Sequence, residues 1–131
     1  AKAAEEAGCD ALSITNSYPA MAIDIETRRP RLANGTGGLS GPCIKPIAIK
    51  LVWDAAKAVR IPIIGMGGIQ SATDAIEFMM AGATAVAVGT ANFYEPQTAL
   101  QVIDGLGEFM RRHEIEDVRE IVGSVRVEKR S

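Results

Sequence analysis

Two glycine-rich turns in this chain have the composition and spacing of an anion-binding site. Gly65-Met66-Gly67-Gly68-Ile69 follows the apolar residues 61–64, and Gly89-Thr90-Ala91-Asn92 follows the apolar residues 83–88. Glycine permits positive φ angles and close backbone approach, and unpaired N–H groups where a helix begins attract anions. Either turn alone would fit an ordinary tight turn, but two of them after successive apolar segments predict a phosphate cradle.

A third apolar segment, residues 11–14, is followed by the polar residues Thr15, Asn16 and Ser17. An asparagine side chain offers donor hydrogens and an acceptor oxygen, so Asn16 could bind an amide or a pyrimidine edge through two hydrogen bonds. The alternative is turn chemistry, because asparagine and serine are common in loops. The residue types alone leave both interpretations open.

The connection from residue 17 to residue 45 is long and contains Gly35-Thr36-Gly37-Gly38-Leu39-Ser40-Gly41-Pro42. Connections without secondary structure that exceed about 12–15 residues are usually functional lids or disordered segments. A flexible linker is the alternative, but the segment joins a buried strand to a helix, where no linker is needed. We therefore predict a functional loop whose glycines can bring N–H groups to an anion.

No reactive group accompanies these turns in the sequence. There is no Ser/His/Asp set, no paired acid and base, and no lysine directly after an apolar segment. Cys9 and Cys43 stand 34 positions apart without a C-x-x-C motif, so we expect ordinary buried or half-buried thiols in a reducing compartment. His113 lies in a charged stretch, and we expect it to be solvated rather than catalytic.

Short strands and the helices between them must position these residues. The apolar segments 11–14, 61–64 and 83–88 are bounded by glycine, proline or polar residues, which is typical of strands buried on both faces of a parallel sheet. Helices are predicted from Pro46, from the capping-box-like Ser71-Ala72-Thr73-Asp74 to Ala81-Gly82, and from Pro96. A short final helix is expected over 116–122, with a frayed end at 128–131.

Helical spacing assigns an inward face to the first and third of these helices. The first face carries Ile47, Leu51, Val52, Ala55 and Val59, and the third carries Leu100, Ile103, Leu106 or Phe109, and Met110.

Alternating strands and helices predict an α/β fold with right-handed βαβ units and a parallel sheet. Residues 7–14 and 81–88 repeat one pattern, in which Ala-Gly ends a helix and a short turn leads into a strand. This recurrence is typical of a (β/α)8 TIM barrel, but a complete barrel needs eight strands and about 250 residues. We therefore expect residues 1–131 to form about three βα units, the C-terminal part of a single barrel domain whose upstream part is absent.

Composition excludes several classes of protein. Hydrophobic residues make up 47% and charged residues 23% of the chain, with a formal net charge of −2, which is the balance of an ordinary globular domain. No basic footprint suits nucleic acid, and no apolar stretch approaches the roughly 20 residues that span a bilayer. We expect neither a nucleic-acid nor a membrane partner, and a cytoplasmic location.

These segments together resemble the C-terminal part of catalytic subunits in the dihydroorotate dehydrogenase family. The resemblance rests on residues 14–17, 32–42, 61–68 and 85–91, and it extends from about residue 7 to residue 122. Gly-Gly-Leu-Ser-Gly followed by Gly-Met-Gly-Gly is specific to this family and its dihydropyrimidine dehydrogenase relatives. The run from residue 33 to residue 46 is most similar to the class 1B, NAD-linked type.

The resemblance implies a (β/α)8 barrel that holds FMN and oxidises dihydroorotate to orotate in de novo pyrimidine biosynthesis. It implies that Thr15 contacts the flavin and that Asn16 and Ser17 bind orotate, although Ser17 replaces a more usual threonine. The residues that would wrap the ribityl phosphate of FMN are Gly41, Gly67, Gly68, Gly89 and Thr90.

The same resemblance places the family's cysteine base and a flavin-contacting lysine upstream, so no catalytic residue is assigned in this chain. It also implies a homodimer of catalytic subunits and a separate iron–sulfur flavoprotein subunit that passes electrons to NAD+. The isolated segment is expected to be inactive.

Three alternatives stand beside this interpretation. The first is a dihydropyrimidine dehydrogenase-like flavoenzyme that acts on another dihydropyrimidine, and the second is a non-flavin, phosphate-binding TIM-barrel lyase or synthase. The third is a non-catalytic fragment that assembles with itself. Substrate contacts from the upstream loops would distinguish the first alternative from a dihydroorotate dehydrogenase. Flavin absorbance would distinguish the second alternative from any flavoenzyme.

Overall fold

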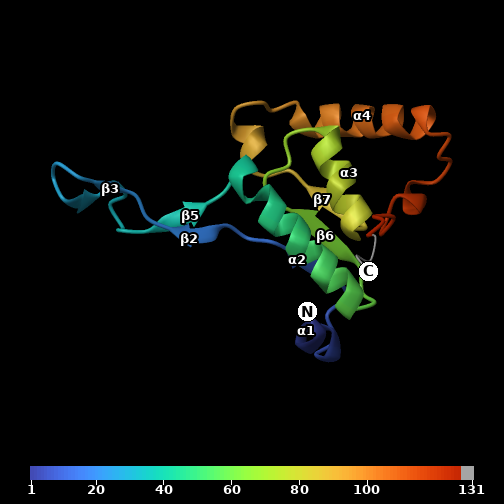
Figure 1. The fold of residues 1–131 in the computed structure, drawn as a ribbon, viewed down its shortest axis with the longest axis horizontal. Coiled ribbons are helices and arrows are strands. Elements are labelled where there is room, and N and C mark those ends of the chain that lie inside the picture. Colours follow the sequence, from blue (N-terminus) through green and yellow to red (C-terminus); the bar gives the residue numbers. More distant parts are fainter. Residues whose placement is uncertain (128–131) are drawn as a thin grey trace.

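A three-stranded parallel sheet lies at the centre of the structure, a computed structural model that describes residues 1–127 (Figure 1). Its strands are β1 (Leu12–Ile14), β6 (Ile63–Met66) and β7 (Ala85–Ala87), in the order β1-β6-β7. Ile14 pairs with Gly65, and Met66 pairs with Ala87. The predicted α/β fold with a parallel sheet is confirmed, and the second strand ends two residues later than the apolar run suggested.

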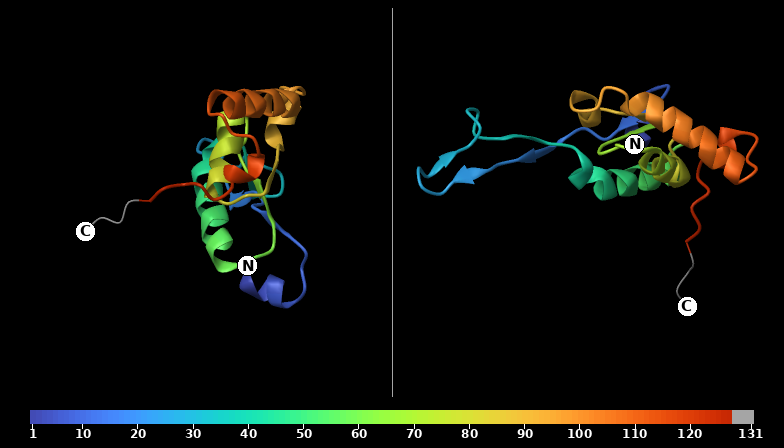
Figure 2. Two further views of the ribbon diagram at one scale, coloured as in Figure 1. Left: turned by 90° about the vertical axis from the view of Figure 1, so that its right-hand side faces the viewer. Right: turned by 90° about the horizontal axis from the view of Figure 1, so that it is seen from above.

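Helices α2 (Lys45–Ala58) and α3 (Ala72–Ala81) lie side by side over one face of this sheet, and α4 (Thr98–Arg112) packs across α3 (Figures 1 and 2). The short helix α1 (Lys2–Glu6) leads into β1. Three 3-10 helices complete the path: η1 (Pro42–Ile44), η2 (Thr90–Phe93) and η3 (Val118–Glu120). Across residues 1–127, no helix is both long and apolar enough to span a membrane.

The core lies between the sheet and the pair α2 and α3. Ile63 and Phe78 are buried there, and a Cβ atom at Gly65 would lie only 2.7 Å from Cδ1 of Phe78. Glycine at position 65 therefore lets α3 pack directly on β6. On the opposite face of β6, Ile64 and Met66 are only half-buried, so the prediction of strands buried on both faces is wrong for this chain.

Helix α3 begins where the capping box predicted it. The Ser71 hydroxyl accepts a hydrogen bond from the Asp74 backbone N–H, and the Asp74 carboxylate accepts one from the Ser71 backbone N–H. The helix ends at Gly82, whose φ of +120° closes the last turn.

The predicted inward faces of the other two long helices need correction. In α2 the buried stripe runs through Ala48, Val52 and Ala55 to Val59, whereas Ile47 and Leu51 are exposed. In α4 the buried residues are Thr98 and Val102, with Leu106, Phe109 and Met110 partly buried. Leu100 and Ile103 are 63% and 64% exposed, so they are not part of the face that α4 packs on α3.

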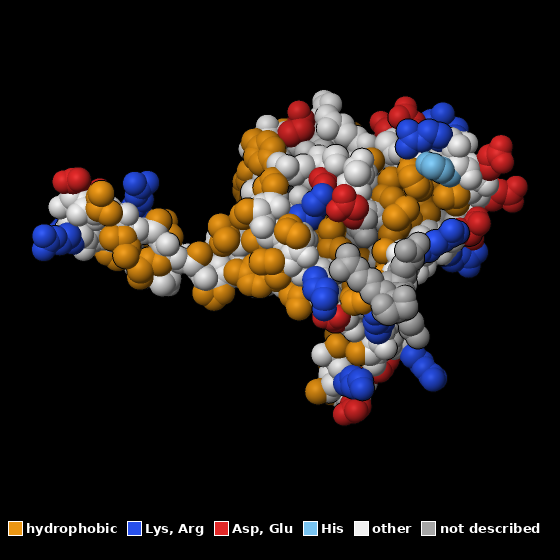
Figure 3. Space-filling view, viewed as in Figure 1, with side chains coloured by type: hydrophobic (Ala, Val, Ile, Leu, Met, Phe, Trp, Pro, Cys, Tyr) orange, Lys and Arg blue, Asp and Glu red, His pale blue; other side chains and the backbone are white. Residues whose placement is uncertain are grey.

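Most of the predicted loop 17–45 is an antiparallel arm, residues 18–39, that projects from the sheet (Figure 1), and η1 then leads into α2. β2 (Tyr18–Ala20) pairs with β5 (Gly37–Leu39), and nearer the tip β3 (Ile23–Asp24) pairs with β4 (Arg29–Pro30). Figure 3 shows hydrophobic side chains along this arm. Its exposed apolar residues are Met21, Ile23, Ile25, Leu32 and Leu39.

The two cysteines, His113 and the expected final helix can each be compared with their predictions. Cys9 and Cys43 are both exposed, so the prediction of buried or half-buried thiols is wrong. His113 is exposed as predicted, and its ring centroid lies 4.3 Å from that of Phe109. The expected final helix is only the 3-10 turn Val118–Glu120, and the expected fraying at 128–131 lies outside the described residues.

Candidate functional site

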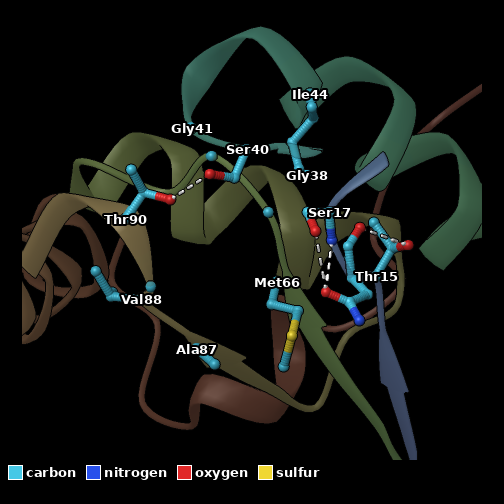
Figure 4. Close-up of a pocket in the computed structure, with 14 residues that line it drawn as sticks. Thr15, Ser17, Gly38, Ser40, Gly41, Ile44, Met66, Ala87, Val88 and Thr90 are labelled. Atoms are coloured by element: carbon cyan, nitrogen blue, oxygen red, sulfur yellow. Dashed lines mark hydrogen bonds between the residues drawn. The ribbon is translucent and has the colours of Figure 1, made fainter. Parts of the chain in front are cut away.

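The carboxyl ends of the three parallel strands open into one cavity of about 650 Å³ (Figure 4). In a parallel α/β sheet this edge is where ligands bind, because the loops that follow the strands converge there. The residues that line the cavity are Thr15, Asn16, Ser17, Gly38, Ser40, Gly41, Ile44, Met66, Gly67, Gly68, Ala87, Val88, Gly89 and Thr90. The structure thus brings together all eight site residues named from the sequence.

Two glycine turns meet backbone to backbone on one side of the cavity. Gly41, Gly67 and Gly68 have φ angles of +85°, +120° and +81°, which L side chains rarely adopt. A Cβ atom at Gly68 would lie 2.7 Å from the carbonyl oxygen of Gly41. The turn after β6 and the turn before α2 are therefore packed too closely to admit a side chain between them.

Gly89 differs from these glycines, because the position of its missing Cβ atom is not packed against another turn. Its φ is −107°, and a Cβ atom there would meet no atom within 4 Å. The missing side chain of Gly89 therefore leaves space in the cavity that this residue lines.

A hydrogen bond links the turn after β7 to the loop that precedes α2. The Thr90 hydroxyl donates to the Ser40 hydroxyl at 3.0 Å (Figure 4). Ser40 belongs to the Gly-Gly-Leu-Ser-Gly motif but has no role predicted from the sequence. Its partner stands 50 positions away, so no local spacing could have revealed the link.

The three polar residues after β1 form the other side of the cavity. The Thr15 backbone N–H donates to the Met66 carbonyl at 3.0 Å, which holds this segment beside the end of β6. The Asn16 side-chain oxygen accepts from the Ser17 backbone N–H at 2.7 Å. Within residues 1–127 the Asn16 amide nitrogen makes no hydrogen bond, so it is available as a donor to a ligand.

The arm fixes where Ser17 lies. A Cβ atom at Gly38 would lie 2.3 Å from the Ser17 hydroxyl oxygen, so β5 passes directly against that side chain. Gly38 has no role predicted from the sequence, because its importance comes from the pairing of β2 with β5.

An ion pair ties the start of α2 to the start of α3 behind the cavity. Lys45 Nζ lies 2.6 Å from Asp74 Oδ1 and 3.0 Å from Glu77 Oε2. The hydrogen bond to Asp74 raises the pKa of Lys45. Burial acts to raise the pKa of Asp74, but hydrogen bonds from Lys45, the Gln70 backbone and the Ser71 hydroxyl together hold this pKa below its usual value. Both groups are therefore charged at neutral pH.

The chemistry that the described residues offer is binding and orientation. No ionisable side chain is among the cavity-lining residues, and no cluster of three or more His, Cys, Asp and Glu in residues 1–127 could hold a metal ion. Backbone N–H groups, hydroxyls and one amide can hold an anionic, hydrogen-bonding ligand.

Parallel βα units with a cavity at the carboxyl ends of their strands place the chain among proteins with a (β/α)8 barrel, of which it holds three neighbouring units. A sequence model described as "Dihydroorotate dehydrogenase" matches residues 1–110. The chain belongs to the dihydroorotate dehydrogenase family.

Individual relatives agree with this assignment. The chain is 58% identical to the "Dihydroorotate dehydrogenase B (NAD(+)), catalytic subunit" of Porphyromonas gingivalis, over 98% of this chain and 42% of the relative. It is 56% identical to the protein of the same description from Lachnoclostridium phytofermentans, over 96% of this chain and 42% of the relative. The chain thus spans about two fifths of the length of these relatives.

Solved structures show the same fold. The DHODH of Eimeria tenella in complex with ferulenol superimposes with a TM-score of 0.76 at 34% identity, covering 94% of this chain and 33% of that one. The ligand-free enzyme from the same organism gives a TM-score of 0.75 at 35% identity. Family membership favours the dihydroorotate dehydrogenase interpretation over a non-flavin barrel lyase or synthase.

Proposed function

We propose that this chain provides the phosphate side of an FMN site and part of the substrate site in an enzyme that oxidises dihydroorotate to orotate in pyrimidine biosynthesis. One observation carries the proposal: the residues after three separate strands, which the resemblance assigns to flavin and orotate, line a single cavity. The chain belongs to the family whose name describes this reaction.

The cavity suits FMN in size and in chemistry. Its volume of about 650 Å³ lies within the usual range for small-molecule sites. Its lining carries no acidic side chain, and glycines in its turns allow a phosphate to approach the backbone N–H groups closely. In this proposal Gly41, Gly67, Gly68, Gly89 and Thr90 hold the ribityl phosphate.

Bound FMN supplies the hydride acceptor for the oxidation. Thr15 lies beside the end of β6 and would contact the flavin. Asn16 would donate its amide N–H to orotate, and the Ser17 hydroxyl would donate a second hydrogen bond from the base of the arm. These groups bind and orient the substrate, and the proton acceptor is proposed to come from a cysteine upstream of this chain.

The descriptions of the relatives suggest the partners. Both are named as the catalytic subunit of an NAD(+)-linked enzyme, which supports a second subunit. We infer a homodimer of catalytic subunits that passes electrons to NAD+ through an iron–sulfur flavoprotein subunit, in the cytoplasm, without a nucleic-acid or membrane partner.

The proposal is tested on the full-length protein. We expect the purified protein to release FMN on denaturation, and its flavin absorbance to bleach when dihydroorotate is added anaerobically. Replacing Asn16 with Ala should leave the flavin content unchanged and lower kcat/KM for dihydroorotate about 10- to 100-fold, the cost of one hydrogen bond to a charged ligand.

Three results would contradict the proposal. A wild-type protein that binds no FMN would favour a non-flavin barrel enzyme, and bleaching by dihydrouracil but not by dihydroorotate would favour another dihydropyrimidine. An unchanged kcat/KM in Asn16→Ala would mean that Asn16 stabilises its turn and does not bind the substrate. Lys50→Met, on the exposed side of α2, is the control for substitution itself.

A further inference from the structure

Lys45 occupies an unusual place at the edge of the glycine cradle. It is the first residue of α2, and a Cβ atom at Gly68 would lie 3.0 Å from the Lys45 Cβ atom. Its side chain is only 25% exposed and runs to the start of α3, where it reaches Asp74 and Glu77. Lys45 does not line the cavity, so it acts through its neighbours.

Asp74 divides its two carboxylate oxygens between two tasks. Oδ2 accepts hydrogen bonds from the backbone N–H groups of Gln70 and Ser71, at 2.9 and 3.0 Å, which fixes the first turn of α3. Oδ1 accepts from Lys45 at 2.6 Å. A single carboxylate therefore connects the segment that leaves the Gly67–Gly68 turn to the helix that begins beyond Gly41.

This connection closes a loop of contacts around the cradle. On one side the Gly68 backbone packs against the Gly41 carbonyl and Pro42. On the other side Lys45, three residues beyond Pro42, is held by Asp74, six residues beyond Gly68. The two glycine turns are thus fixed relative to each other both by their backbones and by the ion pair behind them.

We propose that Lys45 and Asp74 are positioning residues for FMN, whose ion pair holds the Gly41 turn and the Gly67–Gly68 turn at the separation that the phosphate requires. This inference rests on the proposed function. Its physical basis is preorganisation, because backbone N–H groups already aimed at an anion need no rearrangement when it binds. Lys45 also offsets the negative charge of Asp74 near the site of an anionic group.

An ordinary surface ion pair would not have this effect. Lys50 and Asp54, one turn further along α2, form such a pair, with side chains 61% and 51% exposed. Exposed pairs contribute little, because solvent screens them and both side chains lose freedom when they pair. The Lys45–Asp74 pair is more buried, joins two different helices, and holds a carboxylate that also caps α3.

The experiment compares FMN with riboflavin, which lacks the phosphate, on full-length apoprotein of wild type, Lys45→Met, Lys45→Arg, Lys50→Met and Ser71→Ala. The dissociation constants are measured by flavin fluorescence, and Tm is measured for each apoprotein. In Lys45→Met we expect the Kd for FMN to rise about 10-fold, while the Kd for riboflavin stays within about 2-fold. Lys45→Arg keeps the charge and should restore most of the FMN affinity.

The controls separate positioning from stability. Ser71→Ala removes a cap of α3 but leaves Lys45 opposite Asp74, so Tm should fall while both dissociation constants stay near the wild-type values. Lys50→Met should change neither quantity. Equal weakening of FMN and riboflavin in Lys45→Met, or unchanged FMN binding, would overturn the inference while the proposed function stands. A wild-type protein without FMN affinity would overturn both.

Discussion

The glycines around the cavity are required for two different physical reasons. Gly67 and Gly68 have positive φ angles and are packed against α2 and the Gly41 turn, so a side chain there would disturb the fold itself. Gly89 has a negative φ and open space around its missing Cβ atom. Of these three glycines, Gly89 is the one at which an added Cβ atom would meet no protein atom within 4 Å.

We expect Gly89→Val in the full-length protein to raise the Kd for FMN at least about 10-fold, because its side chain would project into the space proposed for the phosphate. Riboflavin affinity should change much less, and the Tm of the apoprotein shows separately whether the substitution changes stability. Flavin titration and thermal unfolding measure these quantities. Retention of normal FMN affinity would remove Gly89 from the proposed cradle.

For single residues, the sequence predicted which ones line the cavity but not the contacts that fix their positions. All eight assigned residues directly follow a strand or precede a helix, and such positions converge at the carboxyl edge of a parallel sheet. Ser40, Gly38 and Lys45 were missed because their partners lie 50, 21 and 29 positions away, where local spacing carries no information.

The arm is the element that connects the outer part of the molecule to the site. Its base pairs Tyr18 with Leu39 and Pro19 with Gly38, next to Asn16 and Ser17. The sequence predicted a functional loop here but no strands, because the strands are only two or three residues long and β5 contains two glycines, which have low strand propensity.

A substitution in the arm should therefore affect the substrate rather than the flavin. In Gly38→Ala the new Cβ atom would lie 2.3 Å from the present position of the Ser17 hydroxyl oxygen, so Ser17 must move. We expect KM for dihydroorotate to rise about 10-fold, the cost of losing one hydrogen bond to the substrate, with FMN affinity unchanged. Steady-state kinetics and flavin titration test both statements.

Gly107→Ala is the matched control for Gly38→Ala. A Cβ atom at Gly107 would meet nothing within 4 Å, and alanine in α4 should stabilise the helix by roughly 0.5–1 kcal/mol. Kinetics of this control should equal those of the wild type. An unchanged KM in Gly38→Ala would show that Ser17 does not need its present position to bind substrate.

The sequence predicted the ends of the helices more accurately than the side chains that they bury. The capping box located α3, but Leu51, Leu100 and Ile103 were assigned inward and are exposed. A helix of a barrel packs against the sheet and against a neighbouring helix on each side, and apolar spacing does not say which of these neighbours is present. In the described structure, α4 has α3 on one side, and its exposed apolar residues lie elsewhere on its surface.

At the scale of the whole molecule, the parallel sheet has two open edges among the described residues. β1 and β7 each pair with β6 alone among the described residues, so each has an edge with unpaired backbone groups. The face of β6 opposite α2 and α3 is only half-buried, and Phe93, Leu100 and Ile103 are strongly exposed. Unpaired parallel edges and exposed apolar side chains both favour association with other chains.

We therefore expect a polypeptide of these 131 residues alone to associate in a concentration-dependent manner and to show no dihydroorotate oxidation. The apolar side chains would drive association, and the absence of an ionisable group from the described cavity lining would prevent proton abstraction. Light scattering over a range of concentrations and an assay with added FMN measure the two outcomes. A stable monomer would mean that the three-stranded sheet tolerates its edges, and turnover would mean that a base within these residues had been missed. Because the proposed glycine cradle comes entirely from this chain, weak binding of FMN without turnover is the result that these contacts favour.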